Sequence, residues 1–170
     1  MLKHLLHEYI EFYGRRTLTM LRAIICYFRV PQFRIIVLIR CMQSSTNMII
    51  KKHYQKKLKL KYTVDIGLNC RIGKHFWVEH YSGIVIGNGV KIGDFCTLYQ
   101  GVTIGQRNGE YPHIGNNVTI YPGAIVLGDI NIGDNSIILA GSVVLGDVPQ
   151  GSMVGGNPAV PKQKRKYDKY

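Results

Sequence analysis

The sequence predicts an all-β solenoid of short parallel strands, preceded by a basic α-helical segment. Two observations support this fold class: an aliphatic residue recurs every six positions from Ile66 onward, and eighteen of the 19 glycines lie at or beyond Gly67. A short fixed period over roughly 80 residues is typical of a solenoid, whereas an α-helix requires a period near 3.6. We therefore divide the chain into a helical segment, 1–62, a repeat domain, 63–160, and a basic tail, 161–170.

The first 62 residues are expected to form helices. Apolar residues recur at helical spacing within His4–Tyr13, Thr17–Arg29 and Phe33–Met42, and Pro31 is expected to end the second of these segments. The run Lys51–Lys61 is interpreted as a basic connector. Two roles remain open for the segment: it caps the first coil of the solenoid, or it lies on the anionic inner surface of the membrane.

The net charge of +12 is unevenly distributed along the chain. Residues 1–62 carry 13 Lys or Arg and two acids, residues 63–155 carry four and seven, and residues 156–170 carry five and one. A nucleic-acid binder would show its positive charge on the fold itself, so we expect no nucleic-acid partner. Basic ends around an acidic middle are typical of a protein that meets an anionic surface and a phosphorylated ligand.

The sequence favours a cytoplasmic location. His4, His7 and Glu8 interrupt the beginning of the chain, so no secretory signal is evident. The longest apolar runs, Ala23–Phe28 and Ile35–Ile39, are shorter than the roughly 20 residues of a membrane-spanning helix. The four cysteines form no CxxC pair, which indicates a reducing compartment.

The repeat domain is expected to wind into triangular coils of three hexads. Each hexad supplies a short strand and a turn in which glycine or asparagine accepts unusual backbone angles, and the aliphatic residues stack inward. The spacing widens to eight residues after Val78 and to ten after Ile104, so Glu79–Gly83 and Gln106–His113 should bulge from the coils and build a site. The repeat positions are Ile66, Ile72, Val78, Ile86, Ile92, Leu98, Ile104, Ile114, Ile120, Val126, Ile132, Ile138 and Val144.

This pattern resembles the hexapeptide-repeat family, and the resemblance implies a left-handed parallel β-helix. The hand is taken from the resemblance because parallel crossovers are usually right-handed. Within the family, residues 63–162 resemble serine acetyltransferases and related polysaccharide O-acetyltransferases. The matching segments are Asp65-Ile66, Ile72-Gly73, Val78-Glu79-His80-Tyr81-Ser82-Gly83-Ile84-Val85-Ile86-Gly87, Thr103-Ile104-Gly105, Pro112-His113-Ile114-Gly115 and Ala140-Gly141-Ser142-Val143-Val144.

The resemblance implies that His80 is the catalytic base and that Asp65, fifteen residues earlier, is its partner. Fifteen residues and the local bulge make nearly one coil, so we expect Asp65 to lie beside His80 and fix its tautomer. His80 would remove the proton of an acceptor hydroxyl that attacks the thioester of acetyl-CoA directly. No cysteine or serine is placed to form an acyl-enzyme, and no metal is expected.

The resemblance also implies a homotrimer with acetyl-CoA bound between neighbouring subunits. Lys162 and the tail up to residue 166 would meet the phosphates of CoA. Backbone N–H groups of the glycine-rich turn near Gly105 would face the oxyanion of the transition state. By position, the expected path of the pantetheine arm follows Gly105, Pro122, Ala140, Gly141 and Pro158.

Departures from the serine acetyltransferase pattern favour a sugar hydroxyl as the acceptor. Glu110 and Tyr111 stand where those enzymes have an Arg-His pair, and a glutamate should repel a serine carboxylate. Glu79 replaces an aspartate, and Gly67 replaces a histidine. We therefore expect O-acetylation of a saccharide, free or lipid-linked, in surface or capsular polysaccharide biosynthesis. Its expected contacts are Trp77, Glu79 and Tyr111.

Three alternatives remain. The chain is a serine O-acetyltransferase of cysteine biosynthesis, with a small amino acid as acceptor. It is a γ-type carbonic anhydrase, although the spacing of His75, His80 and His113 does not match that three-histidine zinc site. It is a non-catalytic scaffold built on the same fold, which would have no need of the pair Asp65 and His80.

Overall fold

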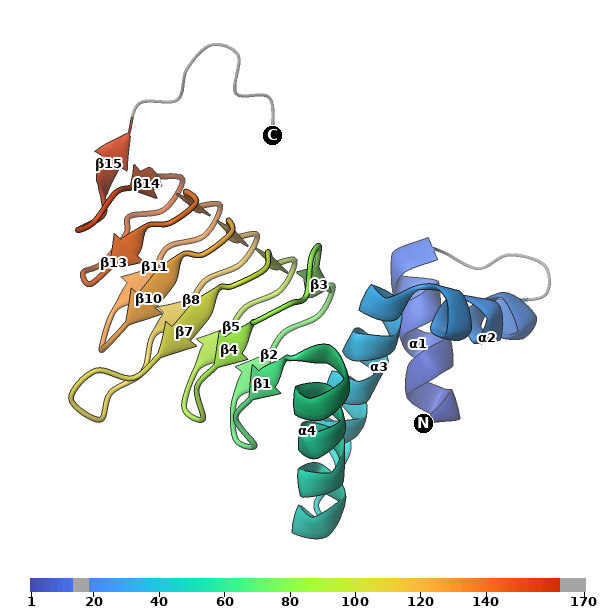
Figure 1. Ribbon diagram of the computed structural model, residues 1–170. Helices are drawn as coiled ribbons and strands as arrows, with labels where there is room; N and C mark the ends of the chain where they lie inside the picture. Colours follow the sequence, from blue (N-terminus) through green and yellow to red (C-terminus); the bar gives the residue numbers. More distant parts are fainter. Residues whose placement is uncertain (14–18, 163–170) are drawn as a thin grey trace.

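The computed structural model describes residues 1–13 and 19–162 and shows helices at one end of a three-sided solenoid (Figure 1). Arg15, Arg16 and the tail beyond Lys162 lie outside the described residues. The helices in the described part of the chain are α1 (Leu2–Tyr13), α2 (Thr19–Arg29), α3 (Pro31–Ser44) and α4 (Met48–Tyr62).

Local sequence explains where the third and fourth helices begin. Pro31 is the first residue of α3, a position where its missing N–H leaves no bond unmade. Pro31 was predicted to end the preceding helical segment, and in the structure it lies at the boundary between α2 and α3. Asn47 caps α4, because its Oδ1 accepts hydrogen bonds from the N–H groups of Ile49 at 2.8 Å and Ile50 at 3.4 Å.

The basic run Lys51–Lys61 is helical, so its prediction as a connector is wrong. Lysine is a good helix former, and a helix needs only a narrow apolar stripe to pack. Tyr54, Leu58 and Tyr62 form that stripe, four residues apart, and Leu58 and Tyr62 are buried. The stripe packs α4 against α3 and β1 and leaves most of the lysines on the surface.

Each of the first four coils contributes one short parallel strand to each of three sheets, and the last coil adds β13 to the first sheet and β14 to the third. The first sheet contains β1 (Asp65–Ile66), β4 (Val85–Ile86), β7 (Thr103–Gly105), β10 (Ile125–Leu127) and β13 (Val143–Val144). The second contains β2 (Arg71–Ile72), β5 (Lys91–Ile92), β8 (His113–Ile114) and β11 (Asn131–Ile132). The third contains β3 (Trp77–Val78), β6 (Thr97–Leu98), β9 (Thr119–Ile120), β12 (Ile137–Ile138), β14 (Met153–Gly155) and the antiparallel β15 (Val160–Lys162).

The register of the sheets confirms the predicted six-residue ladders. In the first sheet Ile66 pairs with Ile86, Ile86 with Ile104, and Ile104 with Val126. These side chains are buried and fill the interior of the solenoid. The expected three-sided β-helix therefore forms because each coil places the same aliphatic positions over those of the coil before.

A second buried ladder lies two residues before the first and was not predicted. Most of its members are apolar, and two are serines whose hydroxyls are satisfied locally. Ser136 Oγ donates to the carbonyl of Pro149 at 3.0 Å, and Ser142 Oγ donates to the carbonyl of Leu139 at 2.6 Å. The six-residue period is present here too, at Val64, Cys70, Phe76, Ile84, Val90, Cys96, Val102, Val118, Ala124, Ile130, Ser136, Ser142 and Val148.

The helices cap the open edge of the first coil. On α3, Arg40 forms a 3.0 Å ion pair with buried Glu8 of α1 and also bonds two carbonyls of the coil. All three sheets are covered at this edge, which would otherwise expose unpaired strands. The bonds run from Gln55 Nε2 to the carbonyl of Ile66 at 2.8 Å, from Arg40 Nη1 to that of Ile72 at 2.7 Å, from Arg40 Nη2 to that of Gly73, and from Gln32 Nε2 to that of Glu79 at 3.1 Å.

Both predicted breaks in phase leave the coil. The first lies between β3 and β4, and the second is a loop, 106–112, between β7 and β8. His113 begins β8, so this loop is one residue shorter than predicted. Within the loop, the N–H groups of Arg107 and Glu110 each bond the other's carbonyl, at 3.0 and 3.2 Å. Asn108 and Gly109 form the turn between them with positive φ, as a tight hairpin requires.

Candidate active site

His80 lies exposed at the corner that joins the third sheet to the first, which we call the third corner. Its ring faces the edge of Tyr99, with ring centroids 6.3 Å apart, and Tyr99 stacks on Tyr121 at 4.9 Å. Tyr99 and Tyr121 occupy equivalent positions of successive coils, and His80 lies one position further along in the coil before them. His80 therefore stands at one end of an aromatic ladder, with its imidazole open to solvent. An accessible imidazole of this kind can exchange a proton with a bound substrate.

Asp65 begins β1 on the coil edge beside the same corner. The N–H of Asp65 bonds the carbonyl of Ile84 at 2.9 Å, so the segment that follows His80 lies directly over β1. The carboxylate of Asp65, however, binds Lys59 Nζ at 2.5 Å. Among the described residues it makes no hydrogen bond to His80, so the expected contact between the two side chains is not formed in the single chain. The catalytic roles of both residues stay predictions.

Two of the predicted acceptor contacts lie together beside His80. Trp77, half-buried on β3, donates a hydrogen bond from Nε1 to Glu79 Oε2 at 2.9 Å. This bond restrains an exposed carboxylate immediately before His80. The backbone carbonyl of Glu79 is in turn held by Gln32 of α3. The corner thus presents one imidazole and one restrained carboxylate side by side in sequence.

Tyr111 does not join this group within the chain. Its loop lies at the corner between the first and second sheets, so the first sheet separates it from the third corner. The ring of Tyr111 packs over Gly87 and Gly89, where an added Cβ would come within 2.8 and 2.4 Å of the ring. Tyr111 is therefore half-buried, and its packing explains why glycine occupies both positions.

The predicted acetyl-CoA contacts fall on two edges of the first sheet. Pro122, Ala140 and Gly141 lie on the third corner, where the N–H of Gly141 bonds the carbonyl of Pro122 at 2.8 Å. Gly105 ends β7 at the opposite edge. Pro158 and Lys162 lie beyond the last coil, in the turn before β15 and at its end. A single chain therefore does not line one continuous path with these residues.

The three histidines of the repeat domain do not gather. His75 stacks on Phe95 with centroids 4.3 Å apart at the corner before β3, while His113 is exposed on β8. His80 lies at the third corner. Within residues 1–13 and 19–162, no group of three His, Cys, Asp or Glu side chains is arranged to hold a metal ion.

Sequence reasoning missed two residues at this site. Tyr99 was detectable, because aromatic residues occupy the same repeat position at 99 and 121. Lys59 carried no signal, because it belongs to a run of lysines and reaches Asp65 only through the packing of α4 on β1.

Comparison with known proteins shows which proteins the repeat domain resembles. Residues 111–146 match the family described as bacterial transferase hexapeptide (six repeats). A serine acetyltransferase of Staphylococcus aureus is 46% identical over 99 residues, which cover 56% of this chain and 46% of that protein. A serine acetyltransferase of Synechococcus elongatus is 37% identical over 119 residues, 66% of this chain and 48% of that protein. The repeat domain of the chain is therefore similar to the hexapeptide-repeat family.

A solved structure extends the match to the whole fold. Serine acetyltransferase of Neisseria gonorrhoeae in complex with serine aligns with the hexapeptide-repeat chain at a TM-score of 0.77 and 28% identity, covering 95% of this chain and 67% of that one. The left-handed parallel β-helix implied by the resemblance is thereby confirmed. The chain nevertheless spans about half the length of the curated relatives it matches.

The prediction of a saccharide acceptor in polysaccharide biosynthesis is wrong. The matched relatives and the solved structure are serine acetyltransferases, which favours the alternative acceptor. The prediction rested on repulsion by Glu110. In the structure, the backbone pair between Arg107 and Glu110 brings a cation to the same loop tip, so the tip as a whole is not anionic.

Proposed function

We propose that this hexapeptide-repeat protein transfers the acetyl group of acetyl-CoA to the hydroxyl of L-serine, with His80 as general base. The observation that carries the proposal is the exposed imidazole of His80 beside the restrained carboxylate of Glu79, in a chain 46% identical over 99 residues to a serine acetyltransferase.

The proposed reaction is a direct transfer. His80 accepts the proton of the serine hydroxyl as its oxygen attacks the thioester carbonyl and forms the new C–O bond. The tetrahedral intermediate then collapses, the C–S bond breaks, and the CoA thiolate leaves and takes the proton from the imidazolium. A base positioned in this way contributes about 10²–10⁴ to the rate. Asp65 stabilises the imidazolium if its carboxylate turns from Lys59 toward His80.

Two charged side chains suit the two ends of the amino acid. Glu79, restrained by Trp77, offers a carboxylate to the ammonium group of serine next to the base. Arg107 offers a planar guanidinium to the carboxylate of serine. Because Arg107 lies across the first sheet from His80, it would reach the site from a neighbouring subunit.

The same geometry supports a homotrimer. Closed rotational symmetry places one edge of a sheet on each subunit against the other edge on the next. Gly105 of one subunit would then face Pro122, Ala140 and Gly141 of another, and the pantetheine arm would lie between them. Lys162 would meet the phosphates of CoA. The free thiols of Cys41, Cys70 and Cys96 are consistent with work in the reducing cytoplasm.

The proposal is tested by thiol release from acetyl-CoA in the presence of L-serine. His80→Ala should lower kcat by about 10²–10⁴. His113→Ala is the matched control, because His113 is exposed on β8 away from the site, and it should retain wild-type turnover. If serine-dependent turnover survives in His80→Ala, His80 is not the general base. If calorimetry shows that acetyl-CoA binds but no serine is acetylated, L-serine is not the acceptor.

A further inference from the structure

Helix α2 turns an apolar stripe toward solvent. Its inner side chains, Ala23 and Tyr27, are buried in a small core that α2 shares with α1 and α3. The outer side chains are large and apolar and recur at helical spacing, so they form one continuous strip. Monomeric proteins rarely leave such a strip uncovered unless it is a binding surface. Its members and their exposed fractions are Met20 (41%), Leu21 (52%), Ile24 (36%), Ile25 (45%) and Phe28 (71%).

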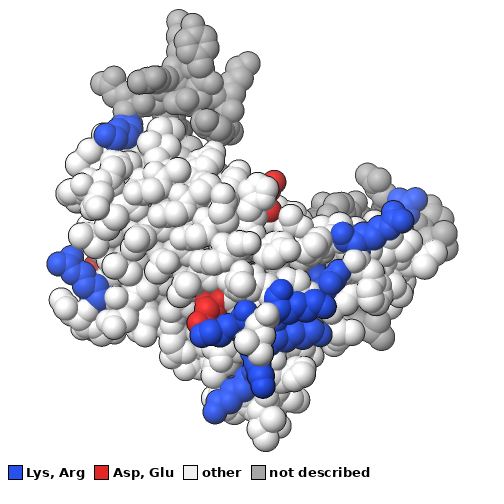
Figure 2. All heavy atoms as spheres, in the orientation of Figure 1, with Lys and Arg blue, Asp and Glu red and all other residues white. Residues whose placement is uncertain are grey.

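Positive side chains border this strip. Arg22 and Arg29 are exposed on α2 itself, and the lysines of α4 continue the charge. Figure 2 shows Lys and Arg side chains gathered over the helical part of the molecule, whereas the coil surface in the same view is mostly uncharged. We refer to α2 and α4 together as the basic face.

The two helices of the basic face are held together at their C-terminal ends. Arg34 of α3 donates from Nε to the carbonyl of Tyr27 at 2.7 Å and from Nη2 to the carbonyl of Phe28 at 2.6 Å. Its Nη1 donates to the hydroxyl of Tyr62 at 3.3 Å. Phe28, the most exposed member of the strip, therefore lies near the end of α4, where the ammonium of Lys61 sits 5.8 Å from the centre of the Tyr62 ring.

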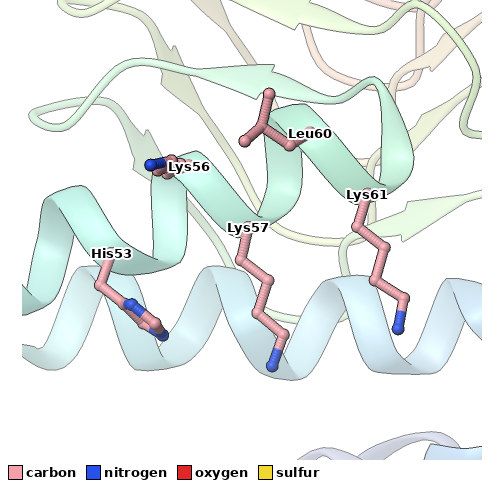
Figure 3. Close-up of a pocket in the computed structure, with 5 residues that line it drawn as sticks. All are labelled: His53, Lys56, Lys57, Leu60 and Lys61. Atoms are coloured by element: carbon pink, nitrogen blue, oxygen red, sulfur yellow. The ribbon is translucent and has the colours of Figure 1, made fainter.

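On α4 the cations line a shallow hollow of about 610 Å³. His53, Lys57 and Lys61 extend from the same side of the helix on successive turns, and Lys56 and Leu60 complete the lining (Figure 3). Three ammonium groups around one apolar side chain offer several donors to a phosphate group next to an acyl chain.

Few carboxylates neutralise the basic face. Asp65 of β1 pairs with Lys59 of α4, and among the described residues the lysines that line the hollow form no ion pair. Glu8 is the one acid among the described side chains of residues 1–62, and it is buried against Arg40. A second copy of the chain related by a two-fold axis would place this face against itself, cation against cation. The charge therefore favours an anionic occupant over a second copy.

We propose that the basic face docks on an anionic phospholipid bilayer. Helix α2 lies along the surface with its apolar strip at the boundary of the acyl chains, and the lysines of α4 bind headgroup phosphates. The proposed contact is peripheral. In the part of the chain that the structure describes, no helix is long and apolar enough to cross a membrane. The contact does not depend on which acceptor the enzyme acetylates.

Vesicle flotation of the full chain tests the proposal. Recovery with phosphatidylcholine vesicles that contain phosphatidylglycerol should exceed recovery with phosphatidylcholine alone by at least about tenfold and fall as salt rises. The double variant Ile24→Ser with Phe28→Ser should no longer insert α2 into the bilayer. The triple variant Lys56→Glu with Lys57→Glu and Lys61→Glu should no longer be attracted to the anionic headgroups. Each should lower binding about tenfold or more. Phe95→Ser and Lys74→Glu with Lys91→Glu, exposed on the coils, are the matched controls and should bind as wild type.

Thermal melting and acetyl transfer should be unchanged in the basic-face variants, because these side chains are exposed and lie outside the catalytic site. Equal recovery with neutral vesicles overturns the proposal, and so does full recovery of both basic-face variants. A wild-type chain that ignores vesicles, with a solution mass that falls in the Ile24→Ser and Phe28→Ser variant, would instead make the strip an interface between copies. Inorganic phosphate that saturates α4 while vesicles leave it unbound would make the hollow a free-anion site.

Discussion

The carboxylate of Asp65 lies 2.5 Å from the ammonium of Lys59, and this ion pair joins β1 to α4. Both side chains are partly exposed, and pairs of this kind contribute about 0–1 kcal/mol. Such a pair opens readily when a better partner is offered to either member. The imidazolium that would form on His80 in the proposed acetyl transfer is such a partner for Asp65, which lies on the same coil edge.

Substitutions at the two members of this pair should have unequal effects. Asp65→Asn removes the charge that we propose stabilises the imidazolium, and it should lower kcat with L-serine by about 10²–10⁴ while KM changes little. Lys59→Met removes only the exposed pair and should change kcat by less than about fivefold. Steady-state kinetics of both variants decide the matter. Equal losses would mean that Asp65 acts through Lys59 and not through His80.

Gly67 should not tolerate a side chain. A Cβ at this position would lie 2.2 Å from Cα of Asn88 in the next coil, and backbone there cannot move without disturbing the ladder. Gly67→Ala should therefore lower the free energy of unfolding by about 1–3 kcal/mol in a denaturant titration. Gly146→Ala is the control, because an added Cβ there meets no atom within 4 Å. Equal midpoints for the two variants would contradict the packing argument.

The loop tip should govern the affinity for serine. Arg107→Ala should raise KM for L-serine by about tenfold, the value of one charge-assisted bond, and leave KM for acetyl-CoA unchanged. The hairpin should survive, because its two bonds use backbone atoms only. Glu110→Gln, on the same hairpin, should leave KM for serine equal or lower. An unchanged KM for L-serine in Arg107→Ala would mean that Arg107 does not bind the serine carboxylate.

Two cysteines of the coils should be almost unreactive in the native protein. Burial raises the pKa of the Cys70 thiol to about 12 and that of Cys96 to about 11. At pH 8 a pKa of about 11 leaves on the order of 10⁻³ of the thiol as thiolate, so alkylation should be over a hundredfold slower than for an ordinary cysteine. Because the thiolate is the reactive form, labelling should accelerate as pH rises toward these values.

Mass spectrometry after timed alkylation measures these rates residue by residue. Cys26, which is partly exposed on α2, provides the internal comparison in the same molecule. Unfolding in denaturant should make all sites react at similar rates. Rapid native labelling of Cys96 would mean that the coils open locally around it.

The β-helix was predictable because every coil repeats one physical requirement. An aliphatic residue must cover the one below, so Ile66, Ile86 and Ile104 recur in phase and in register. Only the handedness of the coil had to be taken from the resemblance to a known family. Helix α4 was not predictable from periodicity, since its stripe is a single residue per turn, Tyr54, Leu58 and Tyr62, among lysines. Such a stripe becomes visible only when α3 is known to cover it.

The site was predictable in part. The spacing of the repeats predicts the insertion that exposes His80, and it also predicts the position of Glu79 beside it. The ion pair of Asp65 is not, because Lys59 reaches it through tertiary packing. The charge of Glu110 led to a wrong prediction for the same reason. A tight turn at Asn108 and Gly109 places Arg107 opposite Glu110, which the sequence alone did not show. Isolated charges predict a ligand poorly when a neighbour in space carries the opposite sign.

The two closures of the solenoid are chemically unlike. Helix side chains seal the first coil, whereas β15 runs antiparallel to β14 and seals the last. Between them the coils are interchangeable in outline, with Ile125 and Val143 marking a step of 18 residues. The length of the molecule is thus modular: a duplicated 18-residue unit at this point could lengthen it and leave the His80 corner and both closures untouched.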